Sequence, residues 1–106
     1  MTQLAVTIRH QTLPGRRDDV RDVWEKHMAP AISRNPGHLA YYYCLDNNDP
    51  DAIVAFQIYD SIESSQAFLL TDAYATYLQE VDPLLTGPPQ LTASTPVFSK
   101  ESTATA

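Results

Sequence analysis

The sequence has 106 residues and a mass of 11.8 kDa, which is the size of one compact domain. Asp and Glu outnumber Lys and Arg by 13 to 7, and the resulting net charge of −6 would repel a nucleic-acid backbone. The sequence contains no apolar run near the roughly 18 residues that span a bilayer and no basic, apolar leader. We therefore expect a cytoplasmic protein that binds neither nucleic acid nor membrane.

The sequence predicts six main elements in chain order. Residues 4 to 10 alternate as in a strand, with one face formed by Leu4, Val6, Ile8 and His10. Apolar residues at helical spacing from Val20 to Ile32 predict a helix that the Asn-Pro-Gly run at 35–37 ends. Two further strands are expected at 38–46 and 53–59, with a turn-rich segment between them. A second helix is expected over 62–70 and, after a break near Thr71 and Asp72, over 73–85; a last strand is expected at 91–98.

This β-α-β-β-α-β order predicts a ferredoxin-like α+β sandwich, with both helical segments on one face of the sheet. One domain covers residues 1–98, and we expect residues 99–106 to be a flexible polar tail. The second and third strands carry apolar side chains on both faces, so the face without helices would expose an apolar patch. A symmetric homodimer that packs sheet against sheet would cover it.

Several short motifs resemble the antibiotic biosynthesis monooxygenase family. They are Leu-Pro-Gly at 13–15, the helix that contains Trp24, Asn-Pro-Gly-His-Leu-Ala-Tyr at 35–41, Asn-Asp-Pro at 48–50, Phe-Gln-Ile-Tyr-Asp-Ser at 56–61 and Thr-Asp-Ala-Tyr at 71–74. The resemblance implies a dimeric α/β barrel with a pocket between the helices and the sheet. In several members of that family the pocket serves cofactor-independent oxidation of polycyclic phenols or quinols by dioxygen.

The sequence also departs from parts of the family. The histidines that many members carry in the second helix are absent from residues 68–74. The haem-degrading branch has an Asn on the first strand, a Trp at the end of the third strand and a His ligand in the second helical region. This chain has no Asn in residues 4–10, Tyr59 at the Trp position and Leu78 near the His position. Haem degradation is therefore disfavoured, and we expect no cofactor.

Two residues are candidate catalytic groups. His27 follows Trp24 by three positions on the apolar side of the first helix, and a histidine suits proton abstraction near neutral pH. The alternative is that His27 hydrogen bonds a carbonyl at the edge of the core. Tyr59 shares a strand face with Gln57, at a position that faces the pocket in the family it resembles.

Aromatic side chains with polar tips suit a flat polycyclic ligand. The candidate substrate-binding residues are Trp24, Tyr41, Tyr43, Gln57, Phe68 and Tyr74. Core and dimer packing is the alternative role for any one of these tyrosines. The single cysteine, Cys44, excludes paired-cysteine sites, and the wide spacing of His10, His27 and His38 disfavours a metal site.

These patterns together predict a cofactor-independent monooxygenase that oxidises a polycyclic phenol, anthrone or quinol with dioxygen. The alternatives are a non-catalytic or small-molecule-binding dimer, and a polyketide cyclase or isomerase on the same scaffold.

Overall fold

The structure is a computed structural model that describes residues 2–100; Met1 and residues 101–106, which make up most of the expected tail, lie outside the described residues. The elements follow one another as β1 (Leu4–Gln11), α1 (Arg17–Arg34), β2 (His38–Leu45), β3 (Ala52–Tyr59), α2 (Ile62–Leu69), α3 (Asp72–Val81), a 3₁₀ turn η1 (Asp82–Leu84) and β4 (Gln90–Ser94). The predicted order of strands and helices is confirmed.

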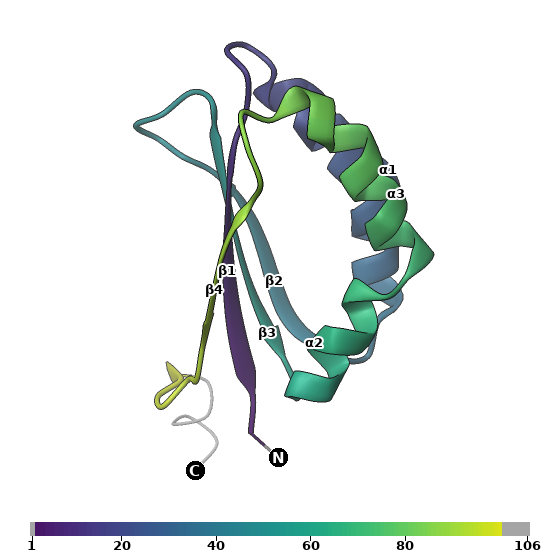
Figure 1. Cartoon of the computed structure of the whole chain (residues 1–106). Coiled ribbons are helices and arrows are strands. Elements are labelled where there is room, and N and C mark those ends of the chain that lie inside the picture. The colour runs from purple at the N-terminus through teal and green to yellow at the C-terminus, as the bar shows by residue number, and fades with distance from the viewer. Residues whose placement is uncertain (1, 101–106) are drawn as a thin grey trace.

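The strands form a four-stranded antiparallel sheet in the order β2-β3-β1-β4. Helices α1, α2 and α3 all lie on one face of this sheet, and the other face carries no helix (Figure 1). The ferredoxin-like α+β prediction is therefore confirmed. We call the face under the helices the inner face and the opposite one the outer face.

The break in the second helical region is a new helix N-terminus. Helix α2 is capped by Ser61, whose hydroxyl accepts a hydrogen bond from the Ser64 amide at 3.1 Å. Thr71 caps α3 in the same way, accepting from the Tyr74 amide at 3.3 Å. The Thr71 cap stops α2 and starts α3 in a new direction.

Two predicted ends were too long, and proline explains both. Helix α3 ends at Val81 rather than at residue 85, because Pro83 has no amide hydrogen to continue it, and the 3₁₀ turn follows instead. Strand β4 ends at Ser94 rather than at residue 98, and Pro96, just beyond that end, has no donor for the ladder.

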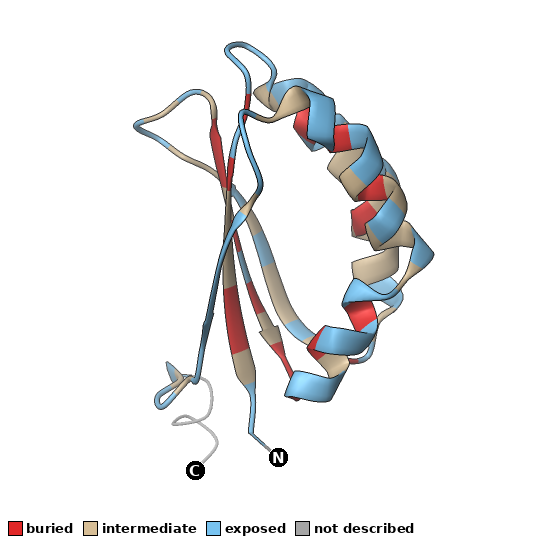
Figure 2. Ribbon diagram, viewed as in Figure 1, coloured by how far each residue is buried: buried red, intermediate tan, exposed pale blue. Residues whose placement is uncertain are grey.

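The core lies between the helices and the inner face. Figure 2 shows buried residues along both the helices and the strands of the sheet that they cover. Val20 of α1, Ile53 of β3 and Val81 of α3 are each 0% exposed. Burying such aliphatic side chains stabilises a fold by roughly 1.5–3 kcal/mol each.

The outer face exposes large apolar side chains. Thr7, Phe56 and Tyr42 pair across β1, β3 and β2 and so project to the same face. Tyr42 is 60% exposed and Phe56 39% exposed. The prediction that the second and third strands are apolar on both faces is confirmed.

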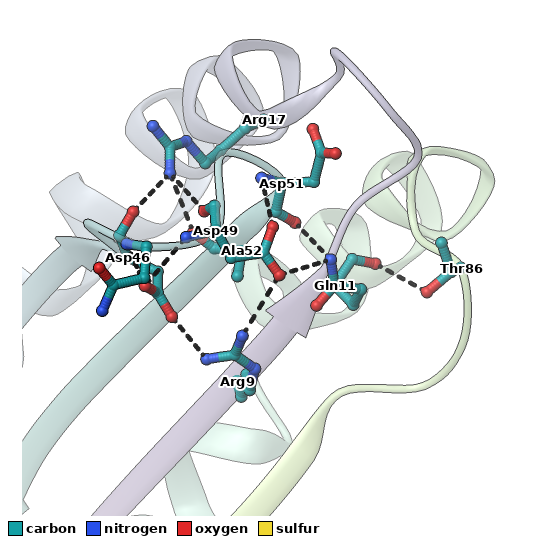
Figure 3. Close-up of polar contacts among 9 residues, drawn as sticks. Arg9, Gln11, Arg17, Asp46, Asp49, Asp51, Ala52 and Thr86 are labelled. Atoms are coloured by element: carbon teal, nitrogen blue, oxygen red, sulfur yellow. Dashed lines mark hydrogen bonds and ion pairs between the residues drawn. The ribbon is translucent and has the colours of Figure 1, made fainter.

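The hairpin between β2 and β3 is tied to the start of α1 (Figure 3). Nη1 of Arg17 donates to the carbonyl oxygens of Asp46 at 3.1 Å, Asp49 at 3.0 Å and Ala52 at 3.4 Å. Arg9 of β1 donates from Nη1 to Oδ2 of Asp46 at 2.9 Å. The two guanidinium groups thus add charged donors to the backbone and side-chain hydrogen bonds that already hold this turn.

We predict that Arg17→Met lowers the free energy of unfolding by about 1–2 kcal/mol, because the loop carbonyls lose a charged donor. The matched control is Arg16→Met, which removes only an exposed ion pair to Asp19 at 2.5 Å and should cost under about 1 kcal/mol. Urea unfolding measures both values. Equal losses in the two variants would contradict this role of Arg17.

Candidate active site

The strand register places aromatic side chains of β2 on the inner face. Tyr43 pairs with Ala55, and Tyr41 pairs with Gln57. Trp24 of α1 lies over both tyrosines: its ring stacks on Tyr43 with centroids 4.1 Å apart, and its Nε1–H donates to the Tyr41 hydroxyl at 3.3 Å. The structure therefore brings three of the candidate substrate-binding residues into contact.

A buried histidine lies near the end of β1, one of the two inner strands of the sheet. His10 of β1 is 5% exposed, and its Nε2 lies 3.0 Å from the hydroxyl of Tyr77, a buried residue of α3. Burial lowers the pKa of His10 to about 4, so its imidazole is neutral at pH 7. Within residues 2–100 the other ring nitrogen, Nδ1, has no hydrogen-bond partner.

The aromatic side chains around Trp24 and the His10–Tyr77 pair together line an interior cavity of about 20 Å³, which is room for about one water molecule. Its aromatic walls include His10, Trp24, Tyr41, Tyr43, Tyr74 and Tyr77. The Tyr43 hydroxyl is the second buried polar atom that finds no partner in the described part of the chain. Burial raises the pKa of Tyr43 above its usual value, so the phenol stays protonated and can donate a hydrogen bond.

A second histidine stands at the other end of the inner face. His38 Nδ1 accepts from the Asn35 amide at 2.8 Å, and Nε2–H donates to the Gln57 side-chain oxygen at 2.9 Å. Its ring packs against Tyr59 at 4.3 Å and Phe68 at 4.7 Å between centroids. Burial lowers the pKa of His38, while the bond to Gln57 raises it. Because both ring nitrogens are engaged, His38 holds its neighbours in place and has no lone pair for a substrate.

A groove of about 410 Å³ opens on the surface beside this second cluster. It lies between the end of α1 and the break that separates α2 from α3, and Arg34, Phe68 and Thr71 are among the residues that line it. Phe68 lines this groove and also packs on His38, so its ring separates the groove from the interior.

The structure places His27 away from the cavity. Its Nε2 lies 2.6 Å from Oε2 of Glu80 on α3, and it is not among the residues that line the cavity. In an α-helix, three positions rotate a side chain by about 300°, so His27 is turned about 60° from Trp24, toward the neighbouring helix. The next turn of α1 contributes Met28 to the cavity instead.

The candidate residues form two adjoining clusters, which meet where Tyr41 packs on His38 and Tyr74 packs on Phe68. Trp24, Tyr41, Tyr43 and Tyr74 line the cavity beside His10, whereas Gln57, Tyr59 and Phe68 surround His38. Sequence analysis did not single out the His10–Tyr77 pair. The alternation that puts His10 on one face with Leu4, Val6 and Ile8 was the available sign that its side chain is buried.

Residues 2–100 contain neither a cluster of metal ligands nor a membrane-spanning helix. No group of three or more His, Cys, Asp or Glu side chains is arranged to hold a metal ion. None of the helices in the same range is long and apolar enough to cross a bilayer.

Comparisons with known proteins define the class. A sequence model described as "antibiotic biosynthesis monooxygenase" matches residues 3–80. The chain therefore belongs to the antibiotic biosynthesis monooxygenase family, as the sequence motifs predicted. A search of curated proteins found no match.

Solved structures share the fold at low sequence identity. Rv0793 from Mycobacterium tuberculosis is 22% identical with a TM-score of 0.83, covering 93% of this chain and 99% of that one. NE2512 from Nitrosomonas europaea, a protein of unknown function, is 22% identical with a TM-score of 0.81 and 94% coverage of both chains. A mutant of SnoaB from Streptomyces nogalater, a cofactor-independent oxygenase, is 12% identical with a TM-score of 0.80, covering 94% of this chain and 98% of that one.

We predict that His10 makes the stability of the fold depend on pH. The pKa of its imidazole is lowered from 6.5 to about 4, so the unfolded chain binds a proton as the pH falls below 6.5 while the folded chain does not. The stability that this neutral histidine contributes is complete above pH 6.5 and is lost as the pH falls toward 4, by about 3 kcal/mol in all.

The variant His10→Gln tests this prediction. Urea unfolding at several pH values between 7 and 4 should show that the stability advantage of the wild type over the variant shrinks steadily as the pH falls. Carboxylates that titrate in both proteins cancel in this difference. A constant difference across the range would mean that His10 does not titrate with a lowered pKa.

Proposed function

We propose that this protein is a cofactor-independent monooxygenase that oxidises a polycyclic phenol, anthrone or quinol with dioxygen. One observation carries the proposal: the buried, neutral His10 lines an aromatic cavity and has a ring nitrogen without a partner among the described residues. A neutral imidazole nitrogen can accept the proton of a phenolic hydroxyl. Aromatic walls favour a flat ring system as the ligand.

In this proposal His10 is the general base, in place of His27. When Nε2–H of His10 donates to the Tyr77 hydroxyl, Nδ1 carries the lone pair that takes the substrate's proton. Tyr77 is then a positioning residue that holds the imidazole ring in place. The imidazolium and the substrate anion attract each other strongly in an apolar interior, which raises the pKa of His10 once the substrate is bound.

The oxidation needs little more from the protein, because the substrate anion is itself the reductant. It passes one electron to dioxygen, and the resulting substrate radical and superoxide join through a new carbon–oxygen bond. The peroxide takes up the proton held by His10. Loss of the proton on the same carbon then breaks the O–O bond, leaving a carbonyl group on the substrate and one molecule of water.

The binding of a polycyclic substrate requires the interior to open, since the cavity of about 20 Å³ holds no ring. The surface groove beside Phe68 provides a route, because this ring is the partition between groove and interior. In the bound state Trp24, Tyr41, Tyr43 and Tyr74 contact the substrate rings. Gln57 and Tyr59 contribute polar groups at the His38 end.

We predict that the purified protein, without added metal or flavin, accelerates dioxygen uptake by an anthrone or naphthoquinol. His10→Gln should lower kcat on the order of 100-fold or more, which is the usual contribution of a general base. The matched variant His27→Gln removes a histidine that pairs with Glu80 outside the cavity and should retain most of the activity. Oxygen-electrode rates measure both.

Both variants must be fully folded at the assay temperature and keep the oligomeric state of the wild type for the rates to be compared. If kcat falls in His27→Gln and not in His10→Gln, the general base is His27 and not His10. No turnover by the intact wild type across a panel of polycyclic phenols and quinols would favour a ligand-binding dimer on the same scaffold.

We also propose that a second copy of this chain covers the outer face. Leu39, Tyr42, Phe56 and Ile58 line a shallow groove of about 560 Å³ there, together with Phe98 from the C-terminal segment. An apolar patch on a sheet of this kind is a surface that monomeric proteins rarely leave in water. Packing two such sheets face to face in a two-fold dimer would bury both patches.

We predict a particle of twice 11.8 kDa in sedimentation or light scattering at micromolar concentration. Tyr42→Asp should shift the protein toward the monomer, because it places a charge in the middle of the apolar sheet. Leu70→Asp changes a side chain that is 85% exposed on the helical side and should leave the mass unchanged. A wild-type protein that is a stable monomer would contradict the proposed dimer.

A further inference from the structure

The interior cavity contains two buried polar atoms that need a partner. Within the described residues neither Nδ1 of His10 nor the hydroxyl of Tyr43 makes a hydrogen bond, and both residues line the same cavity. His10 is only 5% exposed. Buried polar groups in folded proteins nearly always have partners, because an unsatisfied one costs free energy. Two such atoms around one cavity indicate a site for a ligand.

In the closed interior that the structure shows, the cavity is too small for the aromatic substrate, so the ligand that meets these two atoms before the interior opens is a smaller species. A volume of about 20 Å³ holds one water-sized species and no ring. The remaining walls are aromatic and aliphatic, and among the described residues no Asp, Glu, Lys or Arg lines the cavity. The ligand is therefore small and polar, and hydrogen bonds alone hold it.

The hydrogen-bonding roles of the Tyr43 hydroxyl and His10 Nδ1 favour a small oxygen-containing ligand. The buried phenol of Tyr43, whose pKa is raised by burial, is a donor at every physiological pH. Nδ1 of His10 accepts a hydrogen bond in the neutral tautomer that carries its hydrogen on Nε2, and it donates one after it has taken up a proton. A water molecule can accept from Tyr43 and donate to His10, whereas a negatively charged oxygen can accept from both once His10 is protonated.

We propose that this cavity is the oxygen site of the enzyme, occupied by one water molecule at rest and by the oxygen atoms of superoxide and then peroxide during turnover. The inference rests on the proposed function and assigns Tyr43 as a further catalytic residue. Tyr43 donates to the oxygen that gains charge when the substrate anion reduces dioxygen. His10 returns the substrate's proton to the peroxide, whose outer oxygen leaves as water when the O–O bond breaks.

The geometry also explains why the resting water is easy to displace. Buried water molecules typically make about three hydrogen bonds, and this cavity offers two unpaired atoms from the described residues. A weakly held water leaves readily when dioxygen arrives. In an apolar chamber without charged side chains from the described part of the chain, the hydrogen bonds of Tyr43 and His10 are the main stabilisation available to a reduced oxygen.

Tyr43→Phe tests the proposal with two readouts. With an anthrone substrate, kcat should fall on the order of 100-fold, the usual effect of removing one donor to a developing oxyanion. The fraction of consumed dioxygen released as superoxide or hydrogen peroxide should rise several-fold, because the reduced oxygen is no longer held until it bonds to the substrate. Reduction of cytochrome c and a peroxidase assay measure this fraction.

Tyr42→Phe is the matched control, since it removes a tyrosine hydroxyl from the same strand on the outer face. It should leave the released fraction at the wild-type value. Tyr43→Phe should fold with an unfolding temperature equal to or above that of the wild type, because the hydroxyl it removes has no partner within residues 2–100.

A crystal structure of the wild-type protein gives a readout that does not depend on turnover. It should show one water within hydrogen-bond distance of His10 Nδ1 and the Tyr43 hydroxyl. A dry cavity, or unchanged rate and released fraction in Tyr43→Phe, would overturn the oxygen site while leaving the oxygenase proposal in place. A wild-type protein that oxidises no phenol or quinol would refute the proposed function, and the oxygen site with it.

Discussion

The hydrogen bond between His10 and Tyr77 joins the central part of the sheet to α3 inside the protein, at a distance of 3.0 Å. It uses one ring nitrogen of the histidine and leaves the other facing the aromatic interior. An imidazole with two engaged nitrogens, as at His38, has no ring nitrogen left for another partner. His10 and His38 lie in the same layer of the domain, but of the two only His10 has a ring nitrogen without a partner among the described residues. The chemistry proposed for the cavity depends on that nitrogen.

The fold puts this pair in place through its asymmetry. Helices cover only one face of the sheet (Figure 1). On that face His10 and Gln57 are buried, whereas Tyr42 and Phe56 on the other face remain exposed. Strand β1 lies in the interior of the sheet between β3 and β4, and His10 stands near its end, where α3 crosses. The loop that Arg17 ties down lies at that same end of the sheet (Figure 3).

Much of the fold was predictable because each element carries a local pattern. Alternation predicted the strands, and the second helical region was expected to break near Thr71 and Asp72, where the structure shows that Thr71 caps α3. The two ends that were wrong lie beside Pro83 and Pro96, where loss of a donor outweighs the apolar spacing.

The candidate site was less predictable. Periodicity shows that Trp24 and His27 both lie on the apolar half of α1, but two different neighbours pack on that half. Trp24 meets the sheet and His27 meets Glu80 of α3. The three-dimensional arrangement is needed to show that Trp24 and His27 have different neighbours. In the same way, the hydrogen bonds of each ring are needed to distinguish the role of His10 from that of His38.

The chain's acidity and its uncharged cavity together constrain how a substrate is taken up. A net charge of −6 disfavours the approach of phenolate ions, and among the described residues no cationic side chain lines the cavity to attract one. An ion would also lose its hydration on moving into this apolar layer. Under the proposed function, a neutral phenol enters this layer at a lower desolvation cost than a phenolate and loses its proton only at the histidine, because the cationic Arg34 lines the surface groove and not the cavity.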